Sequence, residues 1–331
     1  MQAAICLRTS ANSLRRTLYA LAAIATLSAA TALSTPAQAK HSQHKAASAA
    51  PPKPVKVDCG DNVRLLVNAS AAIQGTLAFA ELRSPAVLSN VSAKWNDKDV
   101  SFWQVSGPDT PKSTNLWRAF VGVDLEQSAG DYKLNISAKS GADSITCAAT
   151  IIVREGKFPT EHLTVAPNFV EPNPEQLAKA QSDQKKLREL YASITPEKLW
   201  TGKFRIPLDG VKTGGNFGRR RVLNGKSNSP HSGVDLSSPT GTPVHAAQSG
   251  RVVLAEELYF SGNTVLIDHG LGIYTLYGHF SEIDAKPGDE VKVGDVIGKV
   301  GATGRVTGPH LHWGLEIDRA RVNALSIVGK Q

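Results

Sequence analysis

The first part of the chain carries a repeated pattern of short apolar runs. Between residues 57 and 154, runs rich in β-branched and aromatic residues are separated by turn residues. These runs are VRLLV, TLAFAEL, VSFWQV, LWRAFVGVDL, YKLNISA and SITCAATIIV. Short strands at this spacing predict an immunoglobulin-like antiparallel β-sandwich over residues 57–154.

A helical period replaces this pattern further along the chain. Asn173 is a capping residue, Pro174 suits the first helical position, and Gln176 stands three residues after the cap. Apolar residues then recur at roughly helical spacing as far as Ile194. We therefore expect a partly helical connector over residues 155–200.

Strand patterns return in residues 201–331, where glycine and proline are frequent. The runs are RVVLAEEL, NTVLIDHG, GIYTLYGHF, DEVKVGDVIGKV and HLHWGLEI. Alternating apolar residues with glycine turns predict a second all-β domain. The expected fold class is therefore mainly β.

The N-terminus has the three parts of an export signal. Arg8, Arg15 and Arg16 precede a short uncharged apolar run, and an Ala-Gln-Ala site ends at residue 39. A membrane anchor needs about 20 apolar residues, more than this run supplies. We predict a cleaved signal over residues 1–39. Paired arginines leave the export route, general or twin-arginine, undecided.

Cleavage would begin the exported chain with a flexible tether, residues 40–56, which are rich in Ala, Pro, Lys and His without periodicity. We expect a protein of the periplasm or the cell envelope, with no stable membrane anchor after cleavage. Cys59 and Cys147 would remain as an even pair, which in an exported protein predicts a disulfide.

The net charge of the chain excludes few functions. The formal net charge is +8, and removal of the signal takes away three arginines and no acid. A mildly basic balance suits an anionic cell envelope. Nucleic acid is not an expected partner, because the Lys and Arg residues are scattered without interleaved aromatic residues.

Candidate chemistry is concentrated in the last domain, in the fragments HSGVD, LYGHF and GPHLHW. In a straight strand His231 and Asp235 would lie about 13 Å apart, too far to bind one ion. The chain must therefore bend between them, and Ser232-Gly233 would permit the bend because glycine takes backbone angles closed to other residues.

His310 and His312 are two residues apart, so a strand would present both on one face, about 6.6 Å apart. A catalytic zinc takes three protein ligands and keeps one open position. His231, Asp235 and either histidine of the pair would complete such a set. The other histidine and His279 would remain for proton transfer and oxyanion stabilisation. Spacing does not decide which histidine of the pair is the ligand.

With NFGRR before them and GTPV and GATGRVTGPHLH around them, these fragments resemble the lysostaphin-type family of peptidoglycan metalloendopeptidases, over about residues 200–320. The resemblance implies a fold of the duplicated hybrid motif type and one zinc per chain. It implies His231, Asp235 and His312 as metal ligands and His279 and His310 as catalytic residues. The implied substrate is the peptide cross-link of bacterial peptidoglycan, hydrolysed during cell-wall remodelling.

Two other functions are open to such a sequence. Degenerate relatives bind peptidoglycan without cleaving it or activate an amidase, but those have typically lost metal ligands. The VKVGDVIGKV hairpin also resembles biotinyl and lipoyl carrier domains, yet the modifiable lysine setting of a carrier does not occur. The bond that is cut, any regulatory protein partner, the oligomeric state and the role of the sandwich stay open.

His245 and His269 stand outside the candidate set. His245, in GTPVHAA, would border the groove or face solvent, and solvent exposure is the expectation. His269, in IDHG, is expected to end a strand and not to bind metal.

Overall fold

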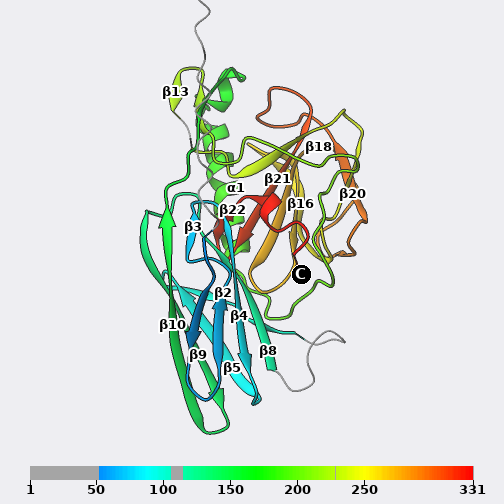
Figure 1. Cartoon of the computed structure of the whole chain (residues 1–331). Helices are drawn as coiled ribbons and strands as arrows, with labels where there is room; N and C mark the ends of the chain where they lie inside the picture. Colours follow the sequence, from blue (N-terminus) through cyan, green and yellow to red (C-terminus); the bar gives the residue numbers. More distant parts are fainter. Residues whose placement is uncertain (1–51, 106–114, 228, 331) are drawn as a thin grey trace, which may run out of the picture. The chain divides into compact units, whose positions relative to one another are not determined.

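Strands are the main secondary structure of the computed structural model, which describes residues 52–105, 115–227 and 229–330 (Figure 1). The prediction of a mainly β fold is confirmed. The predicted signal, residues 1–39, and most of the predicted tether lie outside the described residues. Within the described ranges, no helix combines the length and the apolar character needed to cross a membrane.

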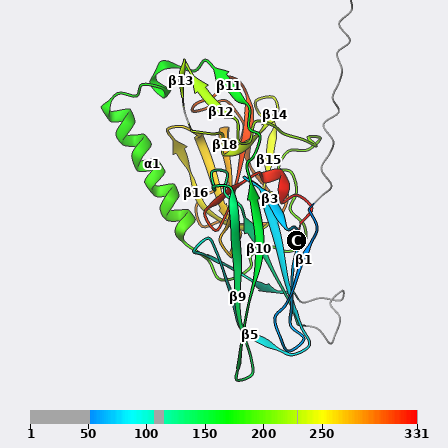
Figure 2. The ribbon, with the colours of Figure 1, turned by 60° about the vertical axis from the view of Figure 1, so that its left-hand side comes forward.

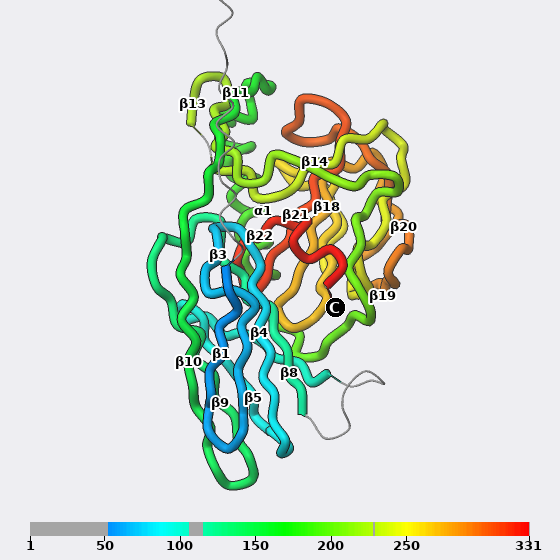
Figure 3. The backbone as a smooth tube through the Cα atoms, viewed as in Figure 1, coloured from blue at the N-terminus to red at the C-terminus, as the bar shows by residue number. Residues whose placement is uncertain are grey.

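Two five-stranded sheets form the predicted sandwich. The first has the order β1 (Val55–Asp58), β2 (Arg64–Val67), β4 (Leu77–Ser84), β8 (Asn115–Gly122), β7 (Trp103–Gln104). The second has the order β3 (Ala71–Ile73), β10 (Asp143–Arg154), β9 (Gly130–Ser140), β5 (Leu88–Trp95), β6 (Lys98–Val100). Figure 3 shows β4 and β8 side by side. Alternate residues of the long strand β10 are buried, which is the pattern of a strand with one face in a core.

Two details of the sandwich differ from expectation. The first strand begins at Val55, inside the segment predicted as tether, because Val55 and Val57 pack against the sandwich core. The run VSFWQV is not one strand: β6 ends at Val100 and β7 begins at Trp103 in the other sheet. Periodicity alone could not detect this change of sheet, since both halves are apolar.

The predicted disulfide joins Cys59, just after β1, to Cys147 in β10. These cysteines are 88 positions apart in the sequence, and both pack against the sandwich core. The bridge therefore links the start of the sandwich to its last strand.

The connector contains the predicted helix and a strand that was not predicted. Helix α1 (Pro174–Ala192) begins at Asn173 with the expected capping box: Asn173 accepts from the Gln176 backbone, and the Gln176 side chain accepts from Asn173. Strand β11 (Thr160–Leu163) forms a small sheet with β12 (Arg220–Leu223) and β13 (Lys226–Ser227). A short 3-10 helix, η1 (Pro167–Phe169), lies between β11 and α1.

The C-terminal sheet has nine strands. Its main path is β14 (Gly233–Ser237), β21 (His310–Ile317), β18 (Ile273–Ile283), β17 (Gly262–Asp268), β16 (Gly250–Leu258), β19 (Glu290–Val291). The remaining strands are β15 (Pro243–His245), β20 (Val296–Val300) and β22 (Ala320–Val322), and η2 (Ala324–Ser326) follows them. Leu187, Leu190 and Tyr191 of α1 pack against apolar residues of this sheet, and Figure 2 shows the helix beside β16.

Aromatic side chains join the sandwich to the C-terminal part. Trp103 of β7 and Phe120 of β8 belong to the same buried cluster as Trp200 and Phe204. The ring centroids of Trp103 and Trp200 are 5.3 Å apart. The described residues of these two parts accordingly form one unit.

Candidate active site

Two neighbouring strands place Asp235 and His312 opposite each other. Strand β14 pairs antiparallel with β21, and Asp235 is the direct partner of His312 in this register. His310 lies two residues earlier on β21, so it is on the same face as His312. The arrangement agrees with the expectation that both histidines address one site.

Gly233 has a steric role that the sequence did not suggest. Its backbone is not in the left-handed region, so the bend predicted to need glycine angles does not use them. A Cβ atom at Gly233 would lie 2.5 Å from His312 Nε2, well inside van der Waals contact. Glycine is therefore required here because the His312 ring occupies the space of a side chain.

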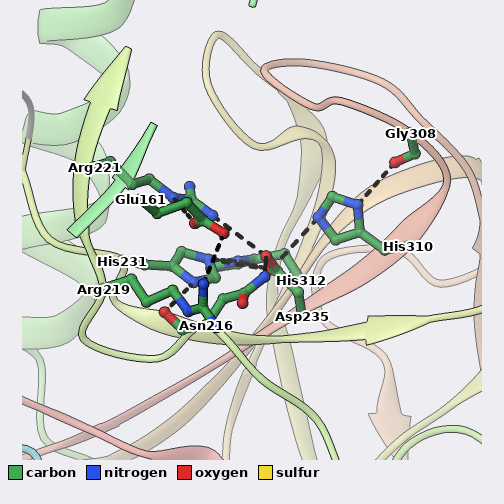
Figure 4. Close-up of polar contacts among 9 residues, drawn as sticks. All are labelled: Glu161, Asn216, Arg219, Arg221, His231, Asp235, Gly308, His310 and His312. Atoms are coloured by element: carbon green, nitrogen blue, oxygen red, sulfur yellow. Dashed lines mark hydrogen bonds and ion pairs between the residues drawn. The ribbon is translucent and has the colours of Figure 1, made fainter. Parts of the chain in front are cut away.

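The side chains of His231, Asp235 and His312 converge, as Figure 4 shows. Asp235 Oδ1 lies 3.1 Å from His231 Nε2 and 3.2 Å from His312 Nδ1. The two nitrogens are 2.9 Å apart. Ligand atoms about 2.0–2.1 Å from a tetrahedral zinc are roughly 3.3 Å from one another. Two imidazoles and a carboxylate at these separations fit a zinc ion.

Neighbouring groups hold these donors in position. His231 Nδ1–H donates to the Asn216 carbonyl oxygen, 3.0 Å away, which leaves Nε2 free to bind a metal. Asp235 Oδ2 accepts from Asn216 Nδ2 at 3.2 Å and from Arg221 at 3.3 Å, which leaves Oδ1 for the metal. The tautomer of His231 and the orientation of the carboxylate are thus both determined outside the cluster.

His279 and His310 lie beside the three donors. Their ring centroids are 4.8 Å apart, and His279 is 5.8 Å from His312 by the same measure. His279 Nδ1–H donates to the Thr303 carbonyl and His310 Nδ1–H to the Gly308 carbonyl, so both have Nε2 free of these bonds. His279 has a left-handed φ of 68°, at an irregularity in the pairing of β18, which redirects its side chain.

The protonation states suit metal binding. Burial lowers the pKa of His231 to about 4. Burial, with the nearby His312 and His310, lowers the pKa of His279 to about 3. Burial alone would raise the pKa of Asp235, but hydrogen bonds from His231, His310 and His312 hold it far below its ordinary value. At neutral pH His231 and His279 are therefore neutral and Asp235 is ionised.

His310 differs from the other histidines of the site. Burial opposes its charged form, yet its hydrogen bond to Asp235 and the charge of that carboxylate raise its pKa above the ordinary value. Its Nε2 lies 3.5 Å from Asp235 Oδ1. His310 is therefore next to the cluster, but it lies farther from Asp235 than His231 and His312 do.

Comparison with known proteins agrees with this geometry. Residues 229–324, which include every residue of the histidine and aspartate cluster, match the model of Peptidase family M23. The C-terminal part of this chain is a peptidase M23 domain. The resemblance to lysostaphin-type peptidases is thereby confirmed, and members of this metallopeptidase family use a bound metal.

Curated relatives resemble the M23 domain but not the whole chain. Peptidoglycan DD-endopeptidase ShyA of Vibrio cholerae is 42% identical over 123 residues, which are 37% of this chain and 29% of ShyA. DD-carboxypeptidase/endopeptidase Mpg of Neisseria meningitidis is 43% identical over 97 residues, 29% of this chain and 22% of Mpg. The chain thus spans less than a third of the length of these relatives.

A solved structure extends the likeness beyond the M23 domain. The crystal structure of a protein described as an M23 peptidase from Pseudomonas aeruginosa has a TM-score of 0.57 and 26% sequence identity. The match covers 78% of this chain and 96% of that one. Because this coverage is far larger than the M23 match, the shared fold includes strands upstream of the M23 domain.

Two residues outside the predicted set contact the cluster, and a third, Glu161, is linked to it through Arg221. Arg221 pairs with Asp235, and Glu161 lies 3.9 Å from Arg221 and 3.3 Å from Arg219. Asn216 contacts both His231 and Asp235, as described above. The fragment NFGRR pointed to Asn216 as part of the family pattern, whereas nothing in the sequence pointed to Glu161. Its role depends on the parallel pairing of β11 with β12, which brings the connector to the M23 domain.

A cavity of about 370 Å³ opens beside the cluster. It is lined by His231, His279 and His312 of the M23 domain and by Gln184 and Leu187 of α1. A smaller cavity on the Asp235 and His310 side includes Glu161 of β11. The connector therefore forms part of the walls around the candidate active site.

The remaining histidines of the M23 domain are outside the cluster. His245 is half-buried rather than solvent-exposed, because its ring lies between the Gly294 carbonyl and Asp209. His269 is fully buried and bonds to the Ser249 carbonyl and to Thr275, as befits a structural residue. Burial lowers the pKa of His269 to about 4.

Proposed function

We propose that this chain is a zinc-dependent endopeptidase that hydrolyses the peptide cross-links of bacterial peptidoglycan. One zinc ion per chain would be held by His231 Nε2, Asp235 Oδ1 and His312 Nδ1. The convergence of these three donors, with His279 and His310 beside them, carries the proposal. The names of the relatives ShyA and Mpg support the substrate class.

Each group would have a separate task in peptide hydrolysis. A zinc ion supplies a Lewis acid that polarises a carbonyl and lowers the pKa of water. His279 and His310 divide proton transfer from the attacking water and donation to the developing oxyanion. Asn216 and Arg221 keep His231 and Asp235 in the orientation that exposes their ligand atoms. The cavity beside the cluster gives the substrate peptide access.

We further propose that the protein acts in the cell envelope, because the predicted export signal and the envelope substrate agree. A non-catalytic relative that binds peptidoglycan or activates an amidase is the alternative. The complete set of donors and both histidines argue against that alternative, since such proteins have typically lost metal ligands.

The test is digestion of purified peptidoglycan by the exported chain, with mass spectrometry of the released peptides. We expect loss of cross-linked species, abolished by a chelator and restored by zinc. His279→Ala protein loaded with zinc is the control. A zinc-loaded wild-type protein that binds peptidoglycan but releases no products would contradict the proposal and favour the alternative.

A further inference from the structure

Arg305 lies in the groove close to the candidate catalytic residues. It belongs to the loop of residues 301–309, between β20 and β21. It is half-buried and lines the 370 Å³ cavity together with His279 and His312. It also lines the smaller cavity that contains Asp235 and His310. Its side chain therefore borders the space on both sides of the cluster.

The loop that carries Arg305 is tied to the sheet. The Arg305 backbone N–H donates to the Phe260 carbonyl at 2.8 Å. Thr303 donates through its hydroxyl to the Phe280 carbonyl at 2.9 Å, and its own carbonyl accepts from His279. A Cβ atom at Gly304 would lie 2.4 Å from the Gly262 backbone nitrogen, so the two turns are in close contact. Arg305 and the imidazole of His279 are thus positioned by one loop.

The guanidinium group of Arg305 has no anionic partner within the described parts of the chain. It lies over the Phe260 ring, 4.5 Å from the centroid, and makes no hydrogen bond or ion pair with the described residues. Arg221, the other arginine of the groove, has Asp235 and Glu161 as partners. Burial and the charge of Arg221 lower the pKa of Arg305 to about 10, so it stays protonated at neutral pH.

A half-buried cation without an anion favours binding of an anion from outside. The planar fork of arginine matches a carboxylate, to which it can donate two parallel hydrogen bonds. We propose that Arg305 binds a carboxylate of the substrate peptide beside the scissile bond and so makes the groove selective for acidic peptides. This inference rests on the proposed peptidase function.

The test compares three synthetic cross-linked peptides with the same scissile bond. The first peptide has free carboxyl groups. In the second, the side-chain carboxyl next to the scissile bond is converted to an amide. In the third, the terminal carboxyl is converted to an amide. Hydrogen bonds to charged groups correspond to about 10- to 100-fold in kcat/KM. We expect wild type to prefer the free acid over one of the amides by this factor. The amide that is disfavoured identifies which carboxylate Arg305 binds.

Variants separate carboxylate binding from a structural role. In Arg305→Gln the ratio of acid to amide hydrolysis should fall toward one, and in Arg305→Lys, which keeps the charge without the fork, it should fall in part. Arg251→Gln removes an exposed arginine that pairs with Glu290 on another part of the sheet, and should keep the wild-type ratio. The inference would be overturned if Arg305→Gln hydrolysed the acid and the amide peptides more slowly by the same factor. It would also be overturned if both Arg305 variants kept the wild-type ratio of acid to amide hydrolysis.

A binding measurement distinguishes this inference from the proposed function. The dissociation constants of the acid and amide peptides are measured with zinc-loaded His279→Ala protein, with and without Arg305→Gln. If wild type cleaves no peptide but binding still prefers the acid through Arg305, the function is wrong and the carboxylate site stands. If the protein binds the acid and amide peptides equally well, the proposed carboxylate site is contradicted, whichever peptides the enzyme hydrolyses.

Discussion

Asp235 and His312 are direct partners across the antiparallel pair β14 and β21, and Asp235 Oδ1 lies 3.2 Å from His312 Nδ1. The pairing makes the distance between these two candidate ligand atoms a property of the sheet and not of a loop. Donors held on strands are less easily displaced than donors held on loops. Substitutions that alter this register or crowd these rings should therefore act first on metal affinity.

The two histidines of β21 should respond differently to substitution. His312→Ala should lose both zinc and hydrolysis, because two remaining donors hold zinc poorly. His310→Ala should keep zinc and lose about 100- to 10,000-fold in hydrolysis, and His279→Ala should behave like it. Zinc content by elemental analysis and hydrolysis of peptidoglycan are the two measurements. Equal loss of zinc in the variants at 310 and 312 would show that this division of roles is wrong.

Gly233→Ala should weaken zinc binding without removing any ligand. The added methyl group would sit 2.5 Å from His312 Nε2, so the ring must move away from its position beside Asp235. Misplacement of a ligand should cost about 10- to 100-fold in zinc affinity, as loss of an orienting contact does. Competition with a chelator measures the affinity. Gly215→Ala is the matched control, because a Cβ atom there meets nothing within 4 Å and wild-type affinity is expected.

The stability of the fold should decrease as pH rises toward 8, in part because of Asp318. Burial, partly offset by Lys98 and Arg319, raises the pKa of Asp318 to about 8. The folded state therefore keeps a proton on Asp318 that the unfolded state loses near pH 4. The stability that this proton contributes to the folded state is fully present below pH 4 and is lost as pH rises through 8. The expected loss is at most about 1.4 kcal/mol per pH unit from this residue.

Asp318→Asn tests this pH dependence, because asparagine is neutral and tolerates the left-handed φ of 49° at this turn. Urea unfolding at pH 5, 6, 7 and 8 should give a shallower decrease in the free energy of unfolding for the variant. Burial also raises the pKa of Glu316, to about 7, so some dependence should remain. Parallel curves for variant and wild type would contradict the assignment to Asp318.

Removal of the disulfide should destabilise the sandwich. Closing a loop of this length stabilises by about 4 to 5 kcal/mol in the chain-entropy model, and the cysteines are 88 positions apart. Cys59→Ala/Cys147→Ala should therefore lower the free energy of unfolding by up to this amount, measured in urea. Non-reducing peptide mapping of exported protein should recover the linked pair. Free thiols at both positions would contradict the bridge.

The sequence by itself determined the local elements and the residue types of the site. Alternating apolar runs identified the sandwich and the C-terminal sheet, and the Asn173 capping box marked the start of α1. The order and spacing of the histidines and the aspartate in HSGVD, LYGHF and GPHLHW were enough to indicate a metal site. The spacing of His310 and His312 also predicted correctly that they share a face, since this follows from the two-residue period of a strand.

Tertiary structure decided what depends on contacts between distant segments. Pairing of β11 with β12 brings Glu161 to Arg221, although no local pattern marks Glu161 as part of the site. The reason for Gly233 is the His312 ring across the sheet, which backbone propensity could not reveal. Among the described residues Arg305 has no anionic partner, and this too is visible only in the folded chain. A sequence specifies which groups are present, but the space and the partners of each group are set by segments that meet only in the folded chain.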